Sequence, residues 1–277
     1  MIPISKKVGT CYVCATPIGN LSDISKRLET ILNQVSVIAA EDTRKTALLL
    51  TQLNIKKSLI SLEKHNEATR FKSLYQVIQD GDDIAIVSDA GTPGISDPGS
   101  YTISKLVEHN VIISPIPGPS AVSALVSIAG IGADNYIFGG FFPKKEGQAL
   151  AMLKNMGVLS IPIVCFESPK RIKKTLTLLN NYYKDAYCVV GKELTKCYES
   201  ILYGNPSQIL DTLTDDILKG EWCFIVSLPK EKKEFNTAFI KQACELGLTQ
   251  NQIGTLAKTL GWNKKEVYNY VLNYKQD

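Results

Sequence analysis

Residues 88–99 carry the sequence pattern that points most directly to ligand chemistry. The segment reads Ser-Asp-Ala-Gly-Thr-Pro-Gly-Ile-Ser-Asp-Pro-Gly, so three glycines are interleaved with two prolines. Glycine lets a backbone approach a ligand closely, and proline restricts a loop to few conformations. A tight solvent loop is the alternative, but it would account for one Gly-Pro pair rather than this density. The segment therefore predicts a binding loop that suits a ligand with a ribose and an adenine.

Three further loops, at residues 15–21, 40–44 and 116–121, follow other apolar runs. In an open α/β sheet, ligands bind beyond the carboxyl ends of the strands, so these loops are expected to meet at one site. The second loop contains acidic residues that could accept a proton and Arg44, which could hold a phosphate. Acidic residues after strands are also common helix caps, which is the alternative for at least one of them.

Other kinds of catalytic site lack their sequence signatures. The chain has no G-x-x-x-x-G-K-[ST] and no G-x-S-x-G, and Gly130-Ile131-Gly132 lacks the third glycine of a dinucleotide fingerprint. Of the two histidines, His109 ends a helical stretch, and His65 could face the site, although a surface or capping role is the simpler interpretation. P-loop hydrolysis, Rossmann-type redox chemistry and nucleophilic hydrolysis are therefore disfavoured.

The seven cysteines do not form a disulfide or metal-binding pattern. Their number is odd, and Cys11-Tyr-Val-Cys14 is the one close pair. A zinc or redox site is the alternative for this pair, but no second C-x-x-C accompanies it, and in a strand the two side chains would point to opposite faces. We expect no metal and a reducing, cytoplasmic location.

The composition is that of a folded globular protein. Hydrophobic residues make up 44% of the 277 residues, charged residues make up 21%, and the formal net charge is +4. Any nucleic-acid contact must therefore come from a local patch. Residues 111–133 are free of charge and long enough to span a bilayer, but three prolines would break a single helix there. The segment predicts a strand, a turn and a buried helix, and we expect neither membrane insertion nor export.

Short apolar runs alternate with amphipathic stretches, which is typical of an α/β fold. The runs are apolar on both faces, as in mainly parallel sheets that helices cover on both sides. We predict two α/β domains with mainly parallel sheets, at 1–117 and 118–230, joined by a charged linker to a helical tail at 231–277. The expected strands are Cys11–Ala15, Val35–Ala39, Ile84–Ser88, Val111–Pro115, Tyr136–Gly140, Ile161–Phe166, Ala186–Gly191 and Trp222–Leu228.

Two helix-opening signals mark the tail. Thr249 with Gln252, and Asn263 with Glu266, have the spacing of a capping box, and Gly261 separates the two helices. The tail is therefore expected to resemble a helix-turn-helix. Most short helical hairpins are packing modules, and nucleic-acid contact is the alternative.

Six motifs, taken in order, resemble one protein family. They are ATPIGNL, AAEDTR, SDAGTPGISDPG, PIPGPSA, FESPKR and KELTKCYE, and they span roughly residues 9–228. Together they are similar to the small-subunit ribosomal RNA 2′-O-ribose methyltransferases of the RsmI type, within the tetrapyrrole (corrin/porphyrin) methylase superfamily. The resemblance implies two α/β domains, S-adenosylmethionine in the cleft between them, a homodimer, and methyl transfer to the ribose hydroxyl of a cytidine in the decoding region.

The resemblance also implies site residues. Thr92 stands where the tetrapyrrole-modifying members typically have an acidic residue, which favours the RNA branch. The chain departs from the RNA enzymes because no arginine soon follows the Phe-Pro-Lys segment at 142–144, and because Trp222-Cys223 is atypical. The implied residues for S-adenosylmethionine are Pro17, Ala90, Gly91, Thr92, Ile95, Ser120, Ala121, Phe166, Glu167 and Leu194.

A basic patch lies in the second predicted domain. Between Phe141 and Thr175, seven basic residues stand against two acidic ones, a net charge of +5. Such a patch beside the FESP motif would attract RNA phosphates, and a plain solvated helix face is the alternative for residues 170–174. The expected RNA-binding residues are Arg44, Lys144, Lys145, Lys170, Arg171, Lys173 and Lys174.

Methyl transfer from a sulfonium is an in-line displacement, so positioning would supply most of the catalysis. A base would assist, because a ribose hydroxyl is a poor nucleophile until its proton is accepted. A cation would hold the flanking phosphate. The candidate bases are Glu41, Asp42, Glu167 and Glu193, of which Asp42 and Glu193 rank first, and the candidate cations are Arg44 and Lys192.

Two other functions remain open at this point. One is methylation of a tetrapyrrole on the same fold, and the other is RNA binding without catalysis during ribosome assembly. The expected partner in the leading hypothesis is the small ribosomal subunit or its RNA.

Overall fold

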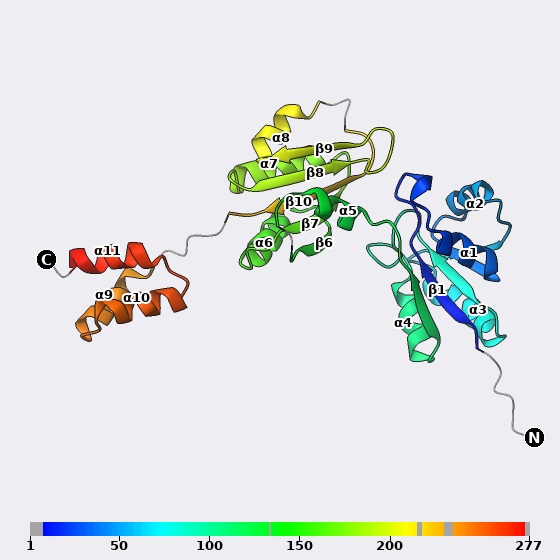
Figure 1. The fold of residues 1–277 in the computed structure, drawn as a ribbon, viewed down its shortest axis with the longest axis horizontal. Coiled ribbons are helices and arrows are strands. Elements are labelled where there is room, and N and C mark those ends of the chain that lie inside the picture. Colours follow the sequence, from blue (N-terminus) through cyan, green and yellow to red (C-terminus); the bar gives the residue numbers. More distant parts are fainter. Residues whose placement is uncertain (1–7, 133, 215–217, 230–234, 275–277) are drawn as a thin grey trace, which may run out of the picture. The chain divides into compact units, whose positions relative to one another are not determined.

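The computed structural model describes residues 8–132, 134–214, 218–229 and 235–274. Its contacts divide the chain into two units, Met1–Leu228 and Pro229–Asp277, and the first unit holds both sheets (Figure 1). The predicted limits at 117/118 and 230/231 stay a prediction, and the charged linker lies outside the described residues.

The first sheet is entirely parallel, with the strand order β3-β2-β4-β1-β5. Its central strand, β4, buries all four of its residues, because helices cover both faces of the sheet. The edge strands are more exposed. The five strands are β1 (Thr10–Cys14), β2 (Val37–Ala40), β3 (Ser58–Ser61), β4 (Ile84–Val87) and β5 (Ile112–Ile116).

Separate apolar clusters cover the two faces of this sheet. One contains side chains of α1 and α2, and the other contains side chains of α3 and α4. Cys14 belongs to the first cluster and Cys11 to the second, so the prediction that the pair points to opposite faces is confirmed. The helices are η1 (Leu21–Asp23), α1 (Lys26–Gln34), α2 (Thr43–Gln52), α3 (Glu67–Gln79) and α4 (Ser100–Glu108).

The second sheet has the order β6-β7-β10-β8-β9 and is mixed. Only the β6–β7 pair is parallel, whereas β10 runs antiparallel to both β7 and β8, and β8 runs antiparallel to β9. The α/β class with two sheets is confirmed, but the prediction of a mainly parallel second sheet is wrong. The strands are β6 (Ile137–Phe141), β7 (Ile163–Glu167), β8 (Tyr187–Lys192), β9 (Ser200–Gly204) and β10 (Trp222–Ser227).

Helices bury both faces of the second sheet, which explains the error. One face packs against α6, α7 and α8, and the other packs against α5. A strand buried on both faces is apolar throughout whichever way its neighbours run, so its composition does not reveal its direction. These helices are α5 (Ala121–Ile128), α6 (Glu146–Gly157), α7 (Ile172–Tyr182) and α8 (Pro206–Thr212).

The second unit contains α9 (Thr237–Glu245), α10 (Gln250–Thr259) and α11 (Lys264–Tyr274), which share an apolar cluster of their own. The capping box at Thr249 is confirmed, since Thr249 and Gln252 bond each other's backbone. Asn263 accepts hydrogen bonds from the amides of Lys265 and Glu266.

The eight strands expected from the sequence match observed strands to within two residues at each end. The uncharged segment that starts at residue 111 forms β5, a turn and α5, as predicted, up to residue 132. Within the described ranges, no helix is both long and apolar enough to cross a membrane.

Candidate active site

A pocket of about 410 Å³ lies where the loops after the strands of both sheets meet. Its volume falls within the range of small-molecule sites. Loops after β1, β2, β4 and β5 and the start of α2 line it from the first sheet, and the end of β6, the loops after β7 and β8, and the start of β10 line it from the second. The lining residues are Ile18, Glu41, Lys45, Asp89, Ala90, Gly91, Thr92, Ile95, Asp97, Ser120, Ala121, Phe141, Phe166, Glu167, Ser168, Pro169, Leu194, Gly220, Glu221, Trp222 and Cys223.

The Gly-Pro loop, residues 88–99, is held against the loop after β1. The amide of Thr16 donates to the carbonyl of Gly91 at 2.9 Å, and the amide of Gly91 donates back at 3.1 Å. Gly91 has φ +81°, and a Cβ there would lie 3.3 Å from Cγ2 of Ile18 and 3.6 Å from the carbonyl oxygen of Pro119. Any larger residue would therefore be strained in its backbone and would crowd the pocket wall.

A buried carboxylate fixes the far end of this loop. Glu67, only 6% exposed, accepts the amide of Gly99 at 3.0 Å with one oxygen. Its other oxygen accepts the amide of Thr102 at 2.9 Å and the hydroxyl of Thr102 at 3.1 Å. Lys64 donates to the carbonyl of Ser96 at 2.7 Å. Glu67 thus caps the start of α4 and fixes the loop, because helix N-termini favour a negative charge.

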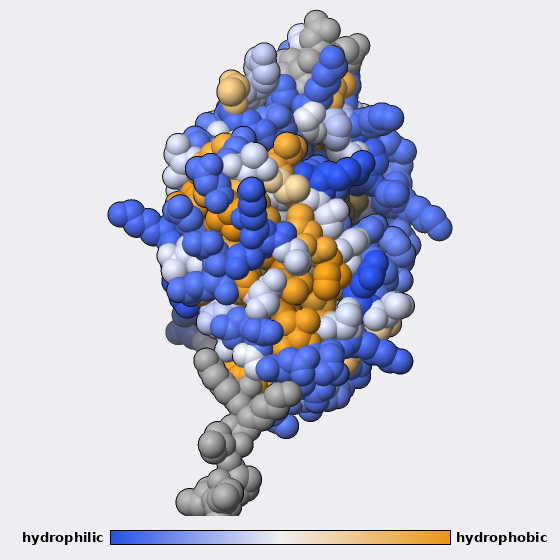
Figure 2. Space-filling model, turned by 90° about the vertical axis from the view of Figure 1, so that its right-hand side faces the viewer, coloured by the Kyte–Doolittle hydropathy of each residue, from blue (hydrophilic) through white to orange (hydrophobic). Residues whose placement is uncertain are grey.

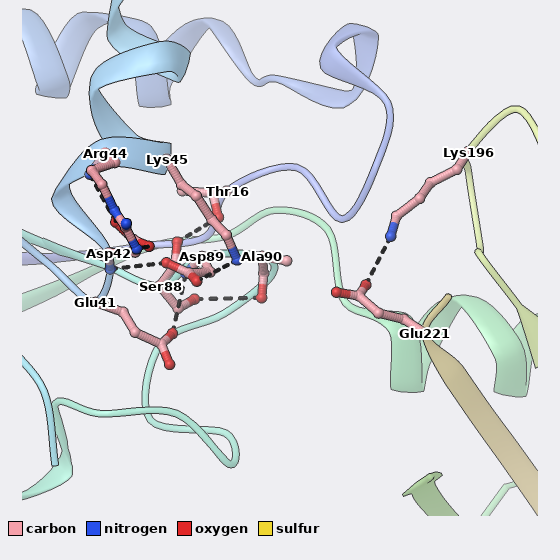
Figure 3. Close-up of polar contacts among 10 residues, drawn as sticks. All are labelled: Thr16, Glu41, Asp42, Arg44, Lys45, Ser88, Asp89, Ala90, Lys196 and Glu221. Atoms are coloured by element: carbon pink, nitrogen blue, oxygen red, sulfur yellow. Dashed lines mark hydrogen bonds and ion pairs between the residues drawn. The ribbon is translucent and has the colours of Figure 1, made fainter. Parts of the chain in front are cut away.

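An ion pair links the start of α2 to the loop after β4. Lys45 lies 2.7 Å from Asp89, which also accepts the amide of Asp42 at 2.9 Å (Figure 3). Glu41 accepts the amide of Asp89 at 3.3 Å. These bonds set two carboxylates and one ammonium group along one wall of the pocket.

Asp97 has the most perturbed carboxyl group along this wall. Burial and the nearby charge of Glu41 raise the pKa of Asp97 to about 6, although Ser88 and Lys64 oppose the rise. Asp97 therefore changes its protonation close to neutral pH, and such groups cluster at functional sites.

The predicted base Asp42 has other partners. Its side chain caps α2 through the amide of Arg44, and it also pairs with the Arg44 guanidinium at 2.7 Å. The hydrogen bonds from Arg44 hold the pKa of Asp42 far below its usual range. Asp42 and Arg44 lie outside the residues that line the pocket.

The loop after β8 carries strained backbone on both sides of a pocket residue. Glu193 and Thr195 have φ of +50° and +67°, and Leu194 between them is 8% exposed and lines the pocket. Such conformations in residues other than glycine persist only where the surroundings enforce them. A Cβ on Gly19 would lie 2.2 Å from Cγ of Lys196, so only glycine lets the first loop approach this one so closely.

Glu193, the other leading candidate base, faces this loop rather than the pocket lining. It accepts Lys196 Nζ at 2.9 Å and the amide of Glu221 at 2.7 Å. Burial opposes ionisation, but these hydrogen bonds outweigh it and lower the pKa of Glu193. Lys196 also pairs with Glu221 at 3.0 Å, on the side of the pocket opposite Lys45 (Figure 3).

Glu167 is a buried structural carboxylate. It accepts hydrogen bonds from the hydroxyl of Thr175 at 2.6 Å and from the amide of Ser168 at 2.7 Å, and it pairs with Arg171. Phe166, its neighbour, packs edge-on against Phe141, and both rings line the pocket. The FESP segment thus presents an aromatic wall that Glu167 holds in place.

Nine of the ten residues expected to bind S-adenosylmethionine line this pocket, and Pro17 lines an adjacent hollow of about 190 Å³ that shares Lys45 and Asp89 with it. Lys192 is buried, at 8% exposure, at the end of β8. Sequence reasoning assigned no role to four charged residues of the lining. Asp89 and Asp97 lie in the Gly-Pro loop, which its glycines and prolines had marked as a binding loop. No residue spacing in the sequence pointed to Lys45 or Glu221.

The expected RNA-binding residues fall into two groups. Arg171 is half-buried and turned toward Glu167 and the carbonyl of Phe142. Arg44 has an exposed side chain on α2, paired with Asp42. The other five are exposed around the starts of α6 and α7: Lys144, Lys145, Lys170, Lys173 and Lys174.

No cluster of three or more histidine, cysteine, aspartate or glutamate side chains suited to a metal occurs in the part of the chain described. Burial raises the pKa of the Cys11 and Cys14 thiols to about 12. Both thiols are therefore protonated at neutral pH and serve as core residues.

Comparison with known proteins identifies the family of the chain. Residues 10–209 match the model of the tetrapyrrole (corrin/porphyrin) methylases. The chain is 34% identical over 274 residues to a ribosomal RNA small subunit methyltransferase I of Neisseria meningitidis, covering 96% of this chain and 94% of that protein. A protein of the same name from Streptococcus pyogenes is 36% identical over 272 residues, covering 95% and 94%.

Solved structures share the fold at low identity. Diphthine synthase superposes with a TM-score of 0.61 at 13% identity, covering 79% of this chain and 89% of its own. The methyltransferase CobJ superposes with a TM-score of 0.59 at 16% identity, covering 79% and 94%. The resemblance drawn from the six motifs is thereby confirmed, and the chain belongs to the tetrapyrrole (corrin/porphyrin) methylase family, among relatives named ribosomal RNA small subunit methyltransferase I.

Proposed function

We propose that this protein transfers a methyl group from S-adenosylmethionine to the ribose 2′-hydroxyl of a cytidine in small-subunit ribosomal RNA. The observation that carries the proposal is the match over nearly the whole chain to relatives named ribosomal RNA small subunit methyltransferase I, with the matching motifs gathered around one pocket. The identity of the acceptor, the 2′-hydroxyl of a cytidine, is inferred from the resemblance of these motifs and not from the geometry of the pocket.

The charges and the size of the pocket suit S-adenosylmethionine. The molecule carries positive charges on its sulfonium and amino groups, and the carboxylate of Glu41 favours positive charge there. Apolar side chains such as Ile18, Ile95 and Leu194 suit an adenine ring. Without a Cβ, Gly91 leaves its backbone open to close approach. We propose the ten residues implied by the family resemblance as the donor site.

When bound, S-adenosylmethionine supplies an electrophilic methyl group on a good leaving group. The chain's own residues then have mainly to orient the acceptor, and holding two reactants in line is worth several kcal/mol, about 7–11 in the best cases. The loops fixed by the Thr16–Gly91 bonds and by Glu67 provide a rigid frame for this orientation. Leu194 and Phe166 give the second side of the pocket an apolar lining.

The exposed lysines at the starts of α6 and α7 are proposed to hold the RNA backbone. All five are exposed, and several cations close together release counterions when they meet phosphates. Arg44 is proposed to assist from α2, where its guanidinium is exposed.

We also propose that the protein acts as a homodimer in the bacterial cytoplasm. Figure 2 shows apolar side chains gathered among hydrophilic ones on one face of the molecule. Val107 on α4 and Ile112 on the edge strand β5 are 58% and 67% exposed. Exposed apolar surface and free strand edges favour association with another chain. Light scattering of the wild type and of Ile112→Lys would test this, since the variant is expected to be monomeric.

The function is tested by incubating the protein with methyl-labelled S-adenosylmethionine and one acceptor at a time. The acceptors are assembled small ribosomal subunits, deproteinised small-subunit RNA, large subunits and a porphyrinogen. Label is expected in small-subunit material alone. Label in the porphyrinogen would replace the proposal by tetrapyrrole methylation, and label in none of them would refute both.

A further inference from the structure

We propose that Asp97 accepts the proton of the acceptor hydroxyl during methyl transfer, an inference that rests on the proposed function. Asp97 lies on the Gly-Pro loop, lines the pocket and is half-buried. The sequence motifs drew attention to the loop's glycines rather than to this carboxylate. The assignment follows from what surrounds each carboxylate at the site.

Most carboxylates of the pocket wall are engaged by cations. Asp89 pairs with Lys45 at 2.7 Å, and Glu221 pairs with Lys196 at 3.0 Å. A carboxylate that a cation stabilises in its ionised form is a poor proton acceptor, because protonation would break the pair. These two residues serve better as fixed charges than as bases.

The candidates from the sequence are engaged in the same way. Asp42 binds its neighbouring arginine and caps α2, Glu193 binds Lys196, and Glu167 binds Arg171 deep in the second sheet. Asp42 and Glu193 also lie outside the pocket lining. With these groups excluded as bases, Asp97 and Glu41 remain as the candidate carboxylates on the pocket wall.

Of these two, Asp97 is the better placed to exchange a proton. Glu41 accepts the backbone amide of Asp89, which ties it to the loop after β4. The charged groups that face Asp97 are Glu41 and Asp89, which make its protonation easier, and Lys64, which makes it harder, together with the hydroxyl of Ser88. With burial added, its pKa of about 6 leaves it ionised at pH 7–8 yet basic enough to take a proton.

The loop backbone holds Asp97 in a fixed place. Ser96 before it has φ +72°, and its carbonyl is bound by Lys64. Gly99 after it has φ +116°, and its amide is bound by buried Glu67. A general base must stay within hydrogen-bond reach of its proton, so anchors on both sides of the residue suit that task.

In the methyl-transfer step, the oxygen of the acceptor hydroxyl forms a bond to the methyl carbon while the carbon–sulfur bond breaks. The electron pair of the broken bond goes to sulfur, which becomes a neutral thioether. The hydroxyl proton moves to the Asp97 carboxylate and later leaves to water. Glu41 assists without contact, because its negative charge favours protonation of Asp97.

The test combines single-turnover methylation of small subunits with a titration of Asp97 by carboxyl carbon NMR in the free protein. Wild type is expected to titrate near pH 6, and its rate should rise about tenfold per pH unit below that value and level off above it. Asp97→Asn should lower the rate by roughly 10²–10⁴ while the Kd for S-adenosylmethionine changes only a few-fold. Asp211→Asn, an exposed carboxylate on α8, is the matched control and should behave as wild type.

A second variant keeps the test decisive if Asp97→Asn folds poorly. Glu41→Gln removes the like charge beside Asp97, so both the NMR midpoint and the pH profile of the rate should move to lower pH together. A profile that stays in place while the NMR midpoint moves overturns the assignment, as does an Asp97→Asn protein that methylates at the wild-type rate. Wild type that methylates no small subunit refutes the proposed function itself, an outcome distinct from both.

Discussion

The two sheets of the first unit contribute to the pocket in different ways. The first sheet is parallel, so the ends of β2, β4 and β5 point to the same edge and bring their polar loops together there. The second sheet is mixed and gives the pocket aromatic and aliphatic side chains, while its helices carry exposed lysines. We infer a division of work in which the first sheet holds the reacting groups and the second supplies the apolar wall and the RNA-binding surface.

The largest effect on RNA binding should come from the basic surface of the second sheet. Reversing Lys170, Lys173 and Lys174 to Glu is expected to weaken binding of small-subunit RNA roughly 10–100-fold at low salt. The slope of the logarithm of the binding constant against the logarithm of the salt concentration should also become shallower by about 2, because three phosphate contacts are lost. Filter binding over a salt series measures both quantities.

The matched control lies on the helices and loops of the first sheet. Lys26, Lys56 and Lys72 are also exposed, and changing them to Glu alters the net charge by the same amount. Equal losses for the two triple variants would mean that overall charge, rather than a surface on the second sheet, binds the RNA.

Binding of S-adenosylmethionine should depend on the Gly-Pro loop of the first sheet. Gly91→Val places a β-branched residue at φ +81° with its Cβ against Ile18, a strain of about 1–3 kcal/mol. We expect the Kd for S-adenosylmethionine to rise roughly 10–100-fold by calorimetry. Gly147→Val, at an open position on α6 of the second sheet, should leave it unchanged. Unchanged binding by Gly91→Val would remove the loop from the donor site.

Stability should report the environment of Asp97 independently of activity. Because the folded-state pKa is raised, the folded protein keeps a proton that the unfolded chain releases, so this group's contribution to stability falls as pH rises from about 4 to 6. Asp97→Asn should therefore be more stable than wild type at pH 7.5, by about 1 kcal/mol after allowance for partial exposure, or roughly 2–4 °C in Tm. At pH 4 the difference should largely vanish, and an equal difference at both pH values would contradict the raised pKa.

The smallest effect is expected at Asp42. Asparagine caps helices well, so Asp42→Asn should change turnover only a few-fold, while Asp42→Ala should cost about 1 kcal/mol in the free energy of unfolding. Chemical denaturation and single-turnover kinetics measure the two quantities. A fall in rate of 10²–10⁴ for Asp42→Asn would restore Asp42 as the base, as the sequence first indicated.

The sequence located those strands and loops whose signal lies within a single segment of the chain. The central strands are apolar on both faces and could be found, but β3 and β9 were not among the expected strands, because these edge strands are half-exposed. Strand direction in the second sheet could not be read, since burial on both faces erases any alternation. The Gly-Pro loop could be identified from its density of glycines and prolines.

The candidate base depended on contacts between distant segments. The cations that engage Asp89 and Glu221 lie 44 and 25 residues away, and Glu67 reaches its loop across 32 residues. Residue spacing in the sequence does not predict such pairs. Sequence could therefore identify the loops that form the pocket but not which of their carboxylates stays available for a proton.

The most direct test of the account is to locate the methyl group that wild-type protein transfers to small ribosomal subunits. After a single turnover with labelled S-adenosylmethionine, the RNA is digested to nucleosides and the label is assigned by mass spectrometry. The account predicts one labelled product, a cytidine methylated at its 2′-oxygen. Label on a base, on a ribosomal protein or nowhere in the subunit would contradict it.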